Sequence, residues 1–240
     1  MRTALGALLI ARVAAAQTAA DPGLPPVAET APQAADAEPG RLRLGLSGRG
    51  GVSDETETTA SRFGGFGVLA GWRFAPDWAG IASLDETFAS QPYLGIGAGE
   101  EAVDETRTDV QAVVDWRIKH DLWEIFTAHL FLGPRFLFVR SDVYRPWMGA
   151  ALIGTRVEAL LHDQLVADVH YGWAHALFGK DDATSALGSF KTTHIYGTGI
   201  ALRLVPMIRV RLGYRGETWV FDRTDRVLHG AEVGLEIRAL

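Results

Sequence analysis

From Arg41 onward, apolar side chains recur at every second position in one segment after another. Leu42, Leu44 and Leu46 alternate with polar or small residues, and the segment 208–221 repeats the pattern. Because successive side chains of a β-strand point to opposite faces, this repeat predicts strands with one apolar and one polar face. No stretch contains the roughly 18 consecutive apolar residues that a transmembrane helix needs, so such a helix is not expected.

The alternation predicts ten strands, with eight as the alternative count. They are expected at residues 41–51, 63–74, 78–89, 106–118, 122–138, 147–161, 165–178, 191–204, 208–221 and 228–240. Two of them are less regular. Glu86 falls on an apolar face, and Pro134 lacks the N–H that a strand ladder needs, which predicts a bulge there. An even number of antiparallel strands, joined in sequence order, predicts an all-β up-and-down barrel.

Four connections are predicted to be tight turns of three residues, at 75–77, 119–121, 162–164 and 205–207. If so, the residues that flank each turn are cross-strand partners and must share a face. The predicted pairs are Phe74 with Trp78, Ile118 with Leu122, Leu161 with Leu165, and Leu204 with Ile208. All four fall on the apolar face. The other connections are mostly longer and polar, and this alternation is typical of outer-membrane barrels.

The aromatic residues indicate which face lies outside. They gather near both ends of the strands, as expected for belts at two membrane interfaces. The predicted girdle consists of Trp72, Phe74, Trp78, Trp116, Trp123, Trp147, Phe178 and Trp219. The polar face instead combines glycine, arginine and carboxylates and contains almost no lysine, unlike a water-exposed surface. We therefore expect an apolar exterior and a polar lumen.

The N-terminal region has a different composition. Residues 1–16 begin with Met1 and the basic Arg2, continue through a short apolar run and end in three alanines. This order predicts a secretory signal peptide with cleavage up to about residue 20. Residues 17–40 are rich in proline and alanine and predict a disordered linker. The barrel domain is then expected to be residues 41–240.

Taken together, residues 41–240 resemble the small outer-membrane β-barrel proteins of Gram-negative bacteria, at the level of architecture and without a specific family motif. The resemblance implies a porin-like envelope protein in the outer membrane, in contact with its lipid. One feature departs from it. Such barrels commonly end in an outward-facing aromatic residue, whereas Leu240 falls on the polar phase.

The charged residues of the polar face predict a network inside the lumen. Its predicted members are Arg73, Asp115, Arg117, Arg135, Arg156, Glu158, Asp168, Arg203, Arg209, Arg211, Arg215, Glu217, Glu232 and Glu236. Such groups are expected to pair with one another, because an unpaired charge in a low-dielectric interior is costly. Ten strands filled with long arginine side chains leave a plugged or very narrow lumen.

These observations lead to three hypotheses about function. The first is a noncatalytic, monomeric envelope protein, either structural or a narrow pore with weak selectivity for small anionic solutes, because basic lumen residues outnumber acidic ones. The second is a barrel-embedded hydrolase acting on outer-membrane lipid, with His129, Asp168 and His170 as candidate groups. The third is a soluble, secreted ligand carrier, in which the apolar face would line the inside of the barrel and the polar face would meet water.

Several other classes of function are not expected. The chain has no cysteine, so thiolate chemistry is not expected. Its formal charge is -6 and no basic helix is evident, so nucleic-acid binding is not expected either. The glycine-rich stretches lack the lysine and the strand-to-helix setting of a phosphate loop. We expect no cofactor and no metal site.

Overall fold

The computed structural model describes residues 41–55, 61–93, 101–118, 125–142, 145–180, 189–222 and 225–239. These residues form ten strands: β1 (Leu42–Glu55), β2 (Ser61–Ala75), β3 (Trp78–Tyr93), β4 (Glu101–Ile118), β5 (Phe126–Arg140), β6 (Trp147–His162), β7 (Leu165–Lys180), β8 (Phe190–Val205), β9 (Ile208–Phe221) and β10 (Asp225–Ala239). None of them forms a helix long and apolar enough to cross a membrane. The predicted signal peptide and linker lie outside the described residues.

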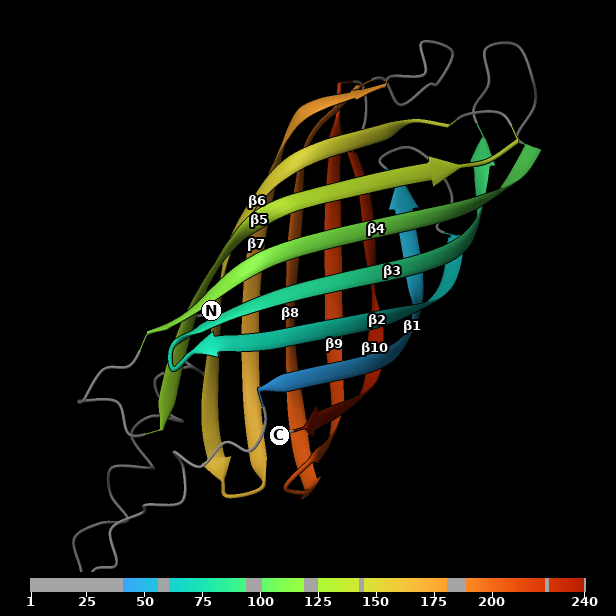
Figure 1. Ribbon diagram of the computed structural model, residues 1–240. Coiled ribbons are helices and arrows are strands. Elements are labelled where there is room, and N and C mark those ends of the chain that lie inside the picture. Colours follow the sequence, from blue (N-terminus) through green and yellow to red (C-terminus); the bar gives the residue numbers. More distant parts are fainter. Residues whose placement is uncertain are drawn as a thin grey trace, which may run out of the picture. The chain divides into compact units, whose positions relative to one another are not determined.

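The ten strands form one closed barrel (Figure 1). Each strand pairs antiparallel with its neighbours in sequence, and β1 closes the barrel against β10. Leu46, for example, lies opposite Val68 of β2 on one side and Leu235 of β10 on the other. The up-and-down topology and the count of ten are confirmed, and the alternative of eight strands is wrong.

Three of the four predicted tight turns are present, each with a β-bulge beside it. Residues 76–77, 163–164 and 206–207 join β2 to β3, β6 to β7 and β8 to β9. In the first turn Trp78 lies opposite Ala75, whereas Arg73 lies opposite Ala79, so Phe74 falls in the bulge. Beyond the bulges, the registers of the strands are those that the predicted flanking pairs require. We call this end of the barrel the turn end, and the opposite end the loop end.

The fourth predicted turn, at residues 119–121, lies outside the described residues, but the flanking pair predicted for it is wrong. Ile118 lies opposite Ala128, not Leu122, and the connection between β4 and β5 spans residues 119–125. The bulge predicted at Pro134 is also absent. The β4–β5 ladder is interrupted there, but its register is the same on both sides, with Gln111 opposite Arg135 and Val114 opposite Leu132. The missing N–H therefore costs hydrogen bonds without shifting the register.

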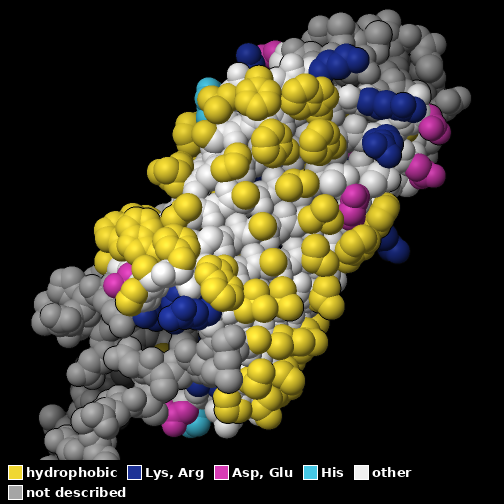
Figure 2. All heavy atoms as spheres, viewed as in Figure 1, with side chains coloured by type: hydrophobic (Ala, Val, Ile, Leu, Met, Phe, Trp, Pro, Cys, Tyr) yellow, Lys and Arg dark blue, Asp and Glu magenta, His cyan; other side chains and the backbone are white. Residues whose placement is uncertain are grey.

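The outer face of the barrel is apolar, as predicted. Leu46, Leu132 and Leu177 are each at least 60% exposed. Apolar side chains cover most of the face seen in Figure 2, and charged side chains gather mainly toward the ends. A soluble barrel would bury these residues at its centre. The hypothesis of a soluble carrier with inverted faces is therefore wrong.

Most residues of the predicted aromatic girdle lie on the outer face. Trp72, Phe74, Trp78, Trp116 and Phe178 are exposed on the outer face. Trp78 stacks on Trp116 near the turn end, with 5.6 Å between ring centroids, and Trp147 packs against Phe138 and Phe178 near the loop end. Trp123 lies outside the described residues.

Trp219 was predicted to belong to the girdle, and this is wrong. Its side chain is only 1% exposed and lies inside the barrel. The reason is its phase: Trp219 is separated from Glu217 and Arg215 by two and four positions, so it shares their inward face.

The interior has two parts of different character. Toward the loop end, Leu137, Met148, Leu152, Ala174 and Phe190 are buried in an apolar cluster. Toward the turn end, the inward positions are mostly charged or glycine. Because β5 and β6 carry apolar residues on both faces near the loop end, the lumen contains a buried apolar cluster there instead of being polar along its whole length.

Candidate functional site

A cavity of about 280 Å³ occupies the lumen, and its lining includes Arg43, Arg209 and Arg238, which lie near the turn end. The strand registers place Arg43 opposite Arg238 and Arg209 opposite Glu236. The cavity is near the lower end of the size range of ligand pockets. It is the principal candidate for a functional site among the described residues.

Positive and negative side chains are equal in number in the lining of the cavity. The arginines are Arg43, Arg156, Arg209, Arg211, Arg215 and Arg238, and the carboxylates are Asp85, Asp115, Glu158, Asp168, Glu232 and Glu236. The lining as a whole therefore carries no excess of basic groups. The prediction of weak anion selectivity rested on the lumen as a whole, where basic residues outnumber acidic ones, and the balance within the cavity does not decide it.

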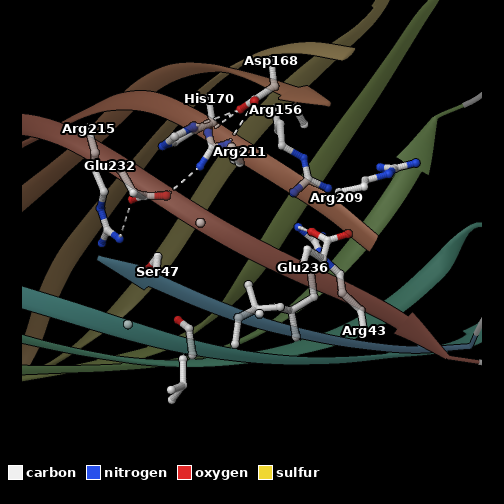
Figure 3. A pocket seen from close by; sticks show the side chains of 18 of the residues that line it. Arg43, Ser47, Arg156, Asp168, His170, Arg209, Arg211, Arg215, Glu232 and Glu236 are labelled. Atoms are coloured by element: carbon white, nitrogen blue, oxygen red, sulfur yellow. Dashed lines mark hydrogen bonds and ion pairs between the residues drawn. The ribbon is translucent and has the colours of Figure 1, made fainter. Parts of the chain in front are cut away.

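The central side chains of the cavity are held by ion pairs between strands (Figure 3). Arg211 of β9 donates to Asp168 of β7 at 2.6 Å and to Glu232 of β10 at 2.9 Å. Arg43 of β1 contacts Glu236 of β10 at 2.6 Å. These pairs fix the side chains that face the cavity, since each charged group has a partner on another strand.

A second group, the mid-lumen cluster, lies on the loop side of the cavity and is centred on Glu217. One carboxylate oxygen accepts hydrogen bonds from Arg215 at 2.8 Å and from Arg49 at 3.2 Å. The other accepts from Trp219 Nε1 at 3.1 Å and from Arg135 at 3.3 Å. Glu217 is 4% exposed, so one buried carboxylate receives four donors from three strands.

The mid-lumen cluster reaches from one wall of the barrel to another. Arg135 of β5 is fully buried and binds Asp109 of β4 at 2.6 Å and Thr193 of β8 at 2.5 Å. Arg215 of β9 contacts Asp85 of β3 at 3.4 Å. Strands β3 and β9 are not neighbours in the barrel, so these side chains must extend through the lumen.

A third group, the loop-end cluster, was not predicted. It consists of Glu105, Arg107, Trp219 and Arg226, all at most 2% exposed. Arg226 of β10 binds Glu105 of β4 at 2.9 Å, Arg107 is also paired with Glu105, and the Arg107 guanidinium lies 4.6 Å from the centroid of the Trp219 ring. A cation over an indole face is a favourable contact.

The sequence did contain the signal for the loop-end cluster. In β4 the inward positions are odd-numbered, and both Glu105 and Arg107 fall on them. In β10 the inward positions are even-numbered, and Arg226 falls on one of them. Glu105 and Arg226 fell outside the predicted strands, because β4 and β10 were predicted to begin at residues 106 and 228 and actually begin at Glu101 and Asp225. Arg107 lay inside the predicted strand 106–118 but was not included in the predicted network.

The remaining predicted network residues lie near the turn end. Arg73 and Arg203 occupy the first inward positions inside two tight turns, and both are half-buried. Arg117 contacts the carboxylate of Asp77 in the β2–β3 turn at 3.6 Å and donates to the carbonyl of Pro76 at 3.3 Å. All of the predicted network residues share the inward phase of their strands.

The three candidate catalytic residues belong to two separate groups. Nδ1 of His129 lies 3.2 Å from the carboxylate of Asp115, and Arg156 lies 3.1 Å from the same carboxylate. Asp168 is bound by Arg211, with Nδ1 of His170 at 3.7 Å. A carboxylate on Nδ1 of His129 would leave its Nε2 as the basic nitrogen.

A nucleophile beside these histidines is not evident. Ser47 lines the cavity, and within the described part of the chain its hydroxyl has no hydrogen bond to a histidine. Nε2 of His129 is buried and unpartnered. Among the described residues, no group of three or more His, Asp or Glu side chains could hold a metal ion.

One charged contact lies beyond the strands. Asp222, which follows β9, pairs with Lys191 at 2.9 Å. This hydrogen bond from Lys191, with another from Ser189, lowers the pKa of Asp222 below its usual value. The contact joins the loop ends of β8 and β9 at the surface, where an ion pair contributes little to stability.

Comparisons with known proteins give a likeness of fold. No protein-family model matches the chain, and no curated protein matches it by sequence. Among solved structures, an outer-membrane channel from Pseudomonas putida F1 matches 87% of this chain and 99% of its own, with 7% identity and a TM-score of 0.51. The translocator domain of autotransporter NalP from Neisseria meningitidis matches 82% of this chain and 88% of its own, with 13% identity and a TM-score of 0.48. Neisserial surface protein A matches 82% of this chain and 96% of its own, with 10% identity and a TM-score of 0.39. The chain has the fold of an outer-membrane β-barrel.

Proposed function

We propose that this protein is a noncatalytic, integral outer-membrane barrel whose lumen is closed to solutes. The closed fold and its apolar exterior support insertion into a membrane, and the similar structures support an outer-membrane location. Short turns at one end and mostly longer connections at the other favour the usual orientation, with the turn end toward the periplasm. Its role is then structural within the envelope.

The observation that carries this proposal is the mid-lumen cluster. Arg135 bridges β4, β8 and β9 through buried contacts, and Glu217 gathers arginines from β1, β5 and β9. The apolar cluster and the loop-end cluster lie beyond it toward the loop end. A solute that crossed the lumen would have to break several buried ion pairs, each of which leaves an uncompensated charge.

Planar-bilayer recording tests whether the lumen is closed. The protein, purified in detergent and inserted into a bilayer, is expected to give no steady single-channel steps in 1 M salt, because packed side chains leave no continuous water path. A porin of known conductance, inserted under the same conditions, serves as the positive control. Steady steps of uniform size would contradict the proposal and favour the narrow pore.

The hydrolase remains the second hypothesis, and the pairing of His129 with Asp115 is the observation in its favour. It requires a nucleophile or an activated water at His129 Nε2, which is buried. We expect mass spectrometry of outer-membrane lipids to find the same species in cells with the protein and in cells without it. A lipid that appears only when the protein is present, and disappears in the His129→Gln variant, would favour the hydrolase.

A further inference from the structure

Apolar side chains form one wall of the lumen cavity. They come from four adjacent strands and are Leu69 of β2, Ile81 of β3, Val113 of β4 and Phe131 of β5. Ile81 lies directly opposite Val113, and both Val113 and Phe131 pack against the apolar cluster. All four side chains are only half-buried, so part of their apolar surface faces the cavity. A solute that displaces water from such a surface gains free energy.

Inward-facing glycines on neighbouring strands leave space in front of this apolar wall. Gly45 of β1 and Gly234 of β10 both line the cavity. An added Cβ would lie 3.4 Å from the nearest atom at Gly45 and 3.5 Å from the nearest atom at Gly234, which are ordinary van der Waals distances. The backbone therefore does not require glycine at either position, and a larger side chain there would project into the cavity.

The charged side chains that line the cavity are already paired with one another (Figure 3). The pairs are Arg43 and Arg238 with Glu236, Arg156 with Asp115 and Glu158, Arg211 with Asp168 and Glu232, and Arg215 with Asp85, while Arg209 lies opposite Glu236. A solute with a net charge would have to take its partner from one of these pairs, and breaking a buried pair is costly. The cavity therefore favours an uncharged solute.

Two neutral hydroxyl groups also line the cavity. They belong to Ser47 of β1 and Ser83 of β3, on the two strands that flank β2. Within the part of the chain that the structure describes, neither hydroxyl takes part in a hydrogen bond. A hydroxyl can both donate and accept, so these two groups can bind a hydroxyl or carbonyl group of a solute. An apolar wall with a few polar groups is the usual composition of a small-molecule site.

The cavity is accessible from the turn end. The side chains of Arg43 and Arg211, which line it, are 27% and 29% exposed. In the mid-lumen cluster, by contrast, the side chain of Arg135 is fully buried. The route of entry for a solute is therefore the turn end, and the mid-lumen cluster closes the other end of the cavity.

We infer that the lumen cavity is a blind binding site for a small uncharged amphiphile, a molecule with an apolar body and a hydroxyl or carbonyl group. The apolar body packs against Leu69, Ile81, Val113 and Phe131, and the polar group binds the serine hydroxyls. This inference goes beyond the proposed structural role, and it does not depend on whether the lumen conducts.

Isothermal titration calorimetry of the protein in an amphipathic polymer tests the inference, with p-cresol as the probe because a phenol is uncharged at pH 7. Saturable binding to a single site is expected. The charged probes 4-methylbenzoate and 4-methylbenzylamine carry the same ring with a negative or a positive group, and each is expected to bind about tenfold or more weakly. No saturable binding of p-cresol, or equally tight binding of either charged probe, overturns the inference.

Gly45→Leu provides the second arm, because its side chain fills the space beside Leu69. It is expected to weaken p-cresol binding about tenfold or more. Gly48→Leu is the matched control: it makes the same change on the same strand, but Gly48 is exposed on the outer face and an added Cβ would meet nothing within 4 Å. This variant is expected to bind as the unchanged protein does. Heat-modifiable gel mobility checks that each variant folds, and Gly234→Leu fills the same cavity from β10 if Gly45→Leu does not fold. Unchanged affinity in a folded cavity-filling variant contradicts the inference.

Discussion

Replacing Glu217 with alanine is expected to destabilise the barrel by about 3–5 kcal/mol, the usual cost of removing one partner from a buried ion pair. Arg49, Arg135 and Arg215 all donate to this carboxylate, and none of the three can turn toward solvent without leaving the lumen. The indole N–H of Trp219 also loses its acceptor. Urea titration of the protein in lipid vesicles, followed by heat-modifiable gel mobility, measures the loss.

Glu158→Ala is the matched control for this experiment. Its side chain is 27% exposed and pairs with Arg156, which keeps Asp115 as a second partner. A partly exposed pair of this kind is expected to contribute about 1 kcal/mol or less. If the two variants were equally stable, Glu217 would not be the centre of the mid-lumen cluster, and the account of the closed lumen would fail with it.

Much of the fold could be predicted because a barrel imposes a simple rule on its sequence. The two-residue period assigns every strand residue to one face, and Phe74, Leu161 and Leu204 set the registers of three hairpins correctly. The rule failed where the chain departs from tight turns. Nothing local at Ile118 indicates that its partner is Ala128, because the pairing of β4 with β5 is decided along the whole ladder.

The lumen was harder to predict than the strands. Phase alone assigns Trp219 to the inner face, and its strand was predicted correctly, so its placement in the girdle overlooked the phase. Glu105 was missed because strand ends are set by pairing at the loop end, which a single sequence does not reveal. Phase also gives no distances. That Arg135 meets Thr193 and Glu217, and that Asp168 meets Arg211 while His129 meets Asp115, depends on how ten strands curve around one axis.

The apolar phase also predicts how the barrel responds to a charge on its outer face. Leu132 lies near the middle of β5 and is 60% exposed. In hydrocarbon, an arginine at mid-depth of a barrel costs about 2–4 kcal/mol, and close to an interface about 0–1 kcal/mol. Leu132→Arg is therefore expected to destabilise the barrel strongly, whereas Leu204→Arg, beside the β8–β9 turn and 54% exposed, is expected to be nearly neutral.

Comparing the two variants separates the effect of lipid from the effect of changing a side chain. Both replace an exposed leucine with arginine, so their exposures are nearly matched. They differ in depth along the strand, and Leu204 also lies in the bulge beside the β8–β9 turn. Urea titration in lipid vesicles measures the free energy of unfolding of each. Equal stability of Leu132→Arg and Leu204→Arg would mean that the middle of β5 does not lie in hydrocarbon. Membrane insertion would then be contradicted, because it requires the apolar outer face to meet hydrocarbon.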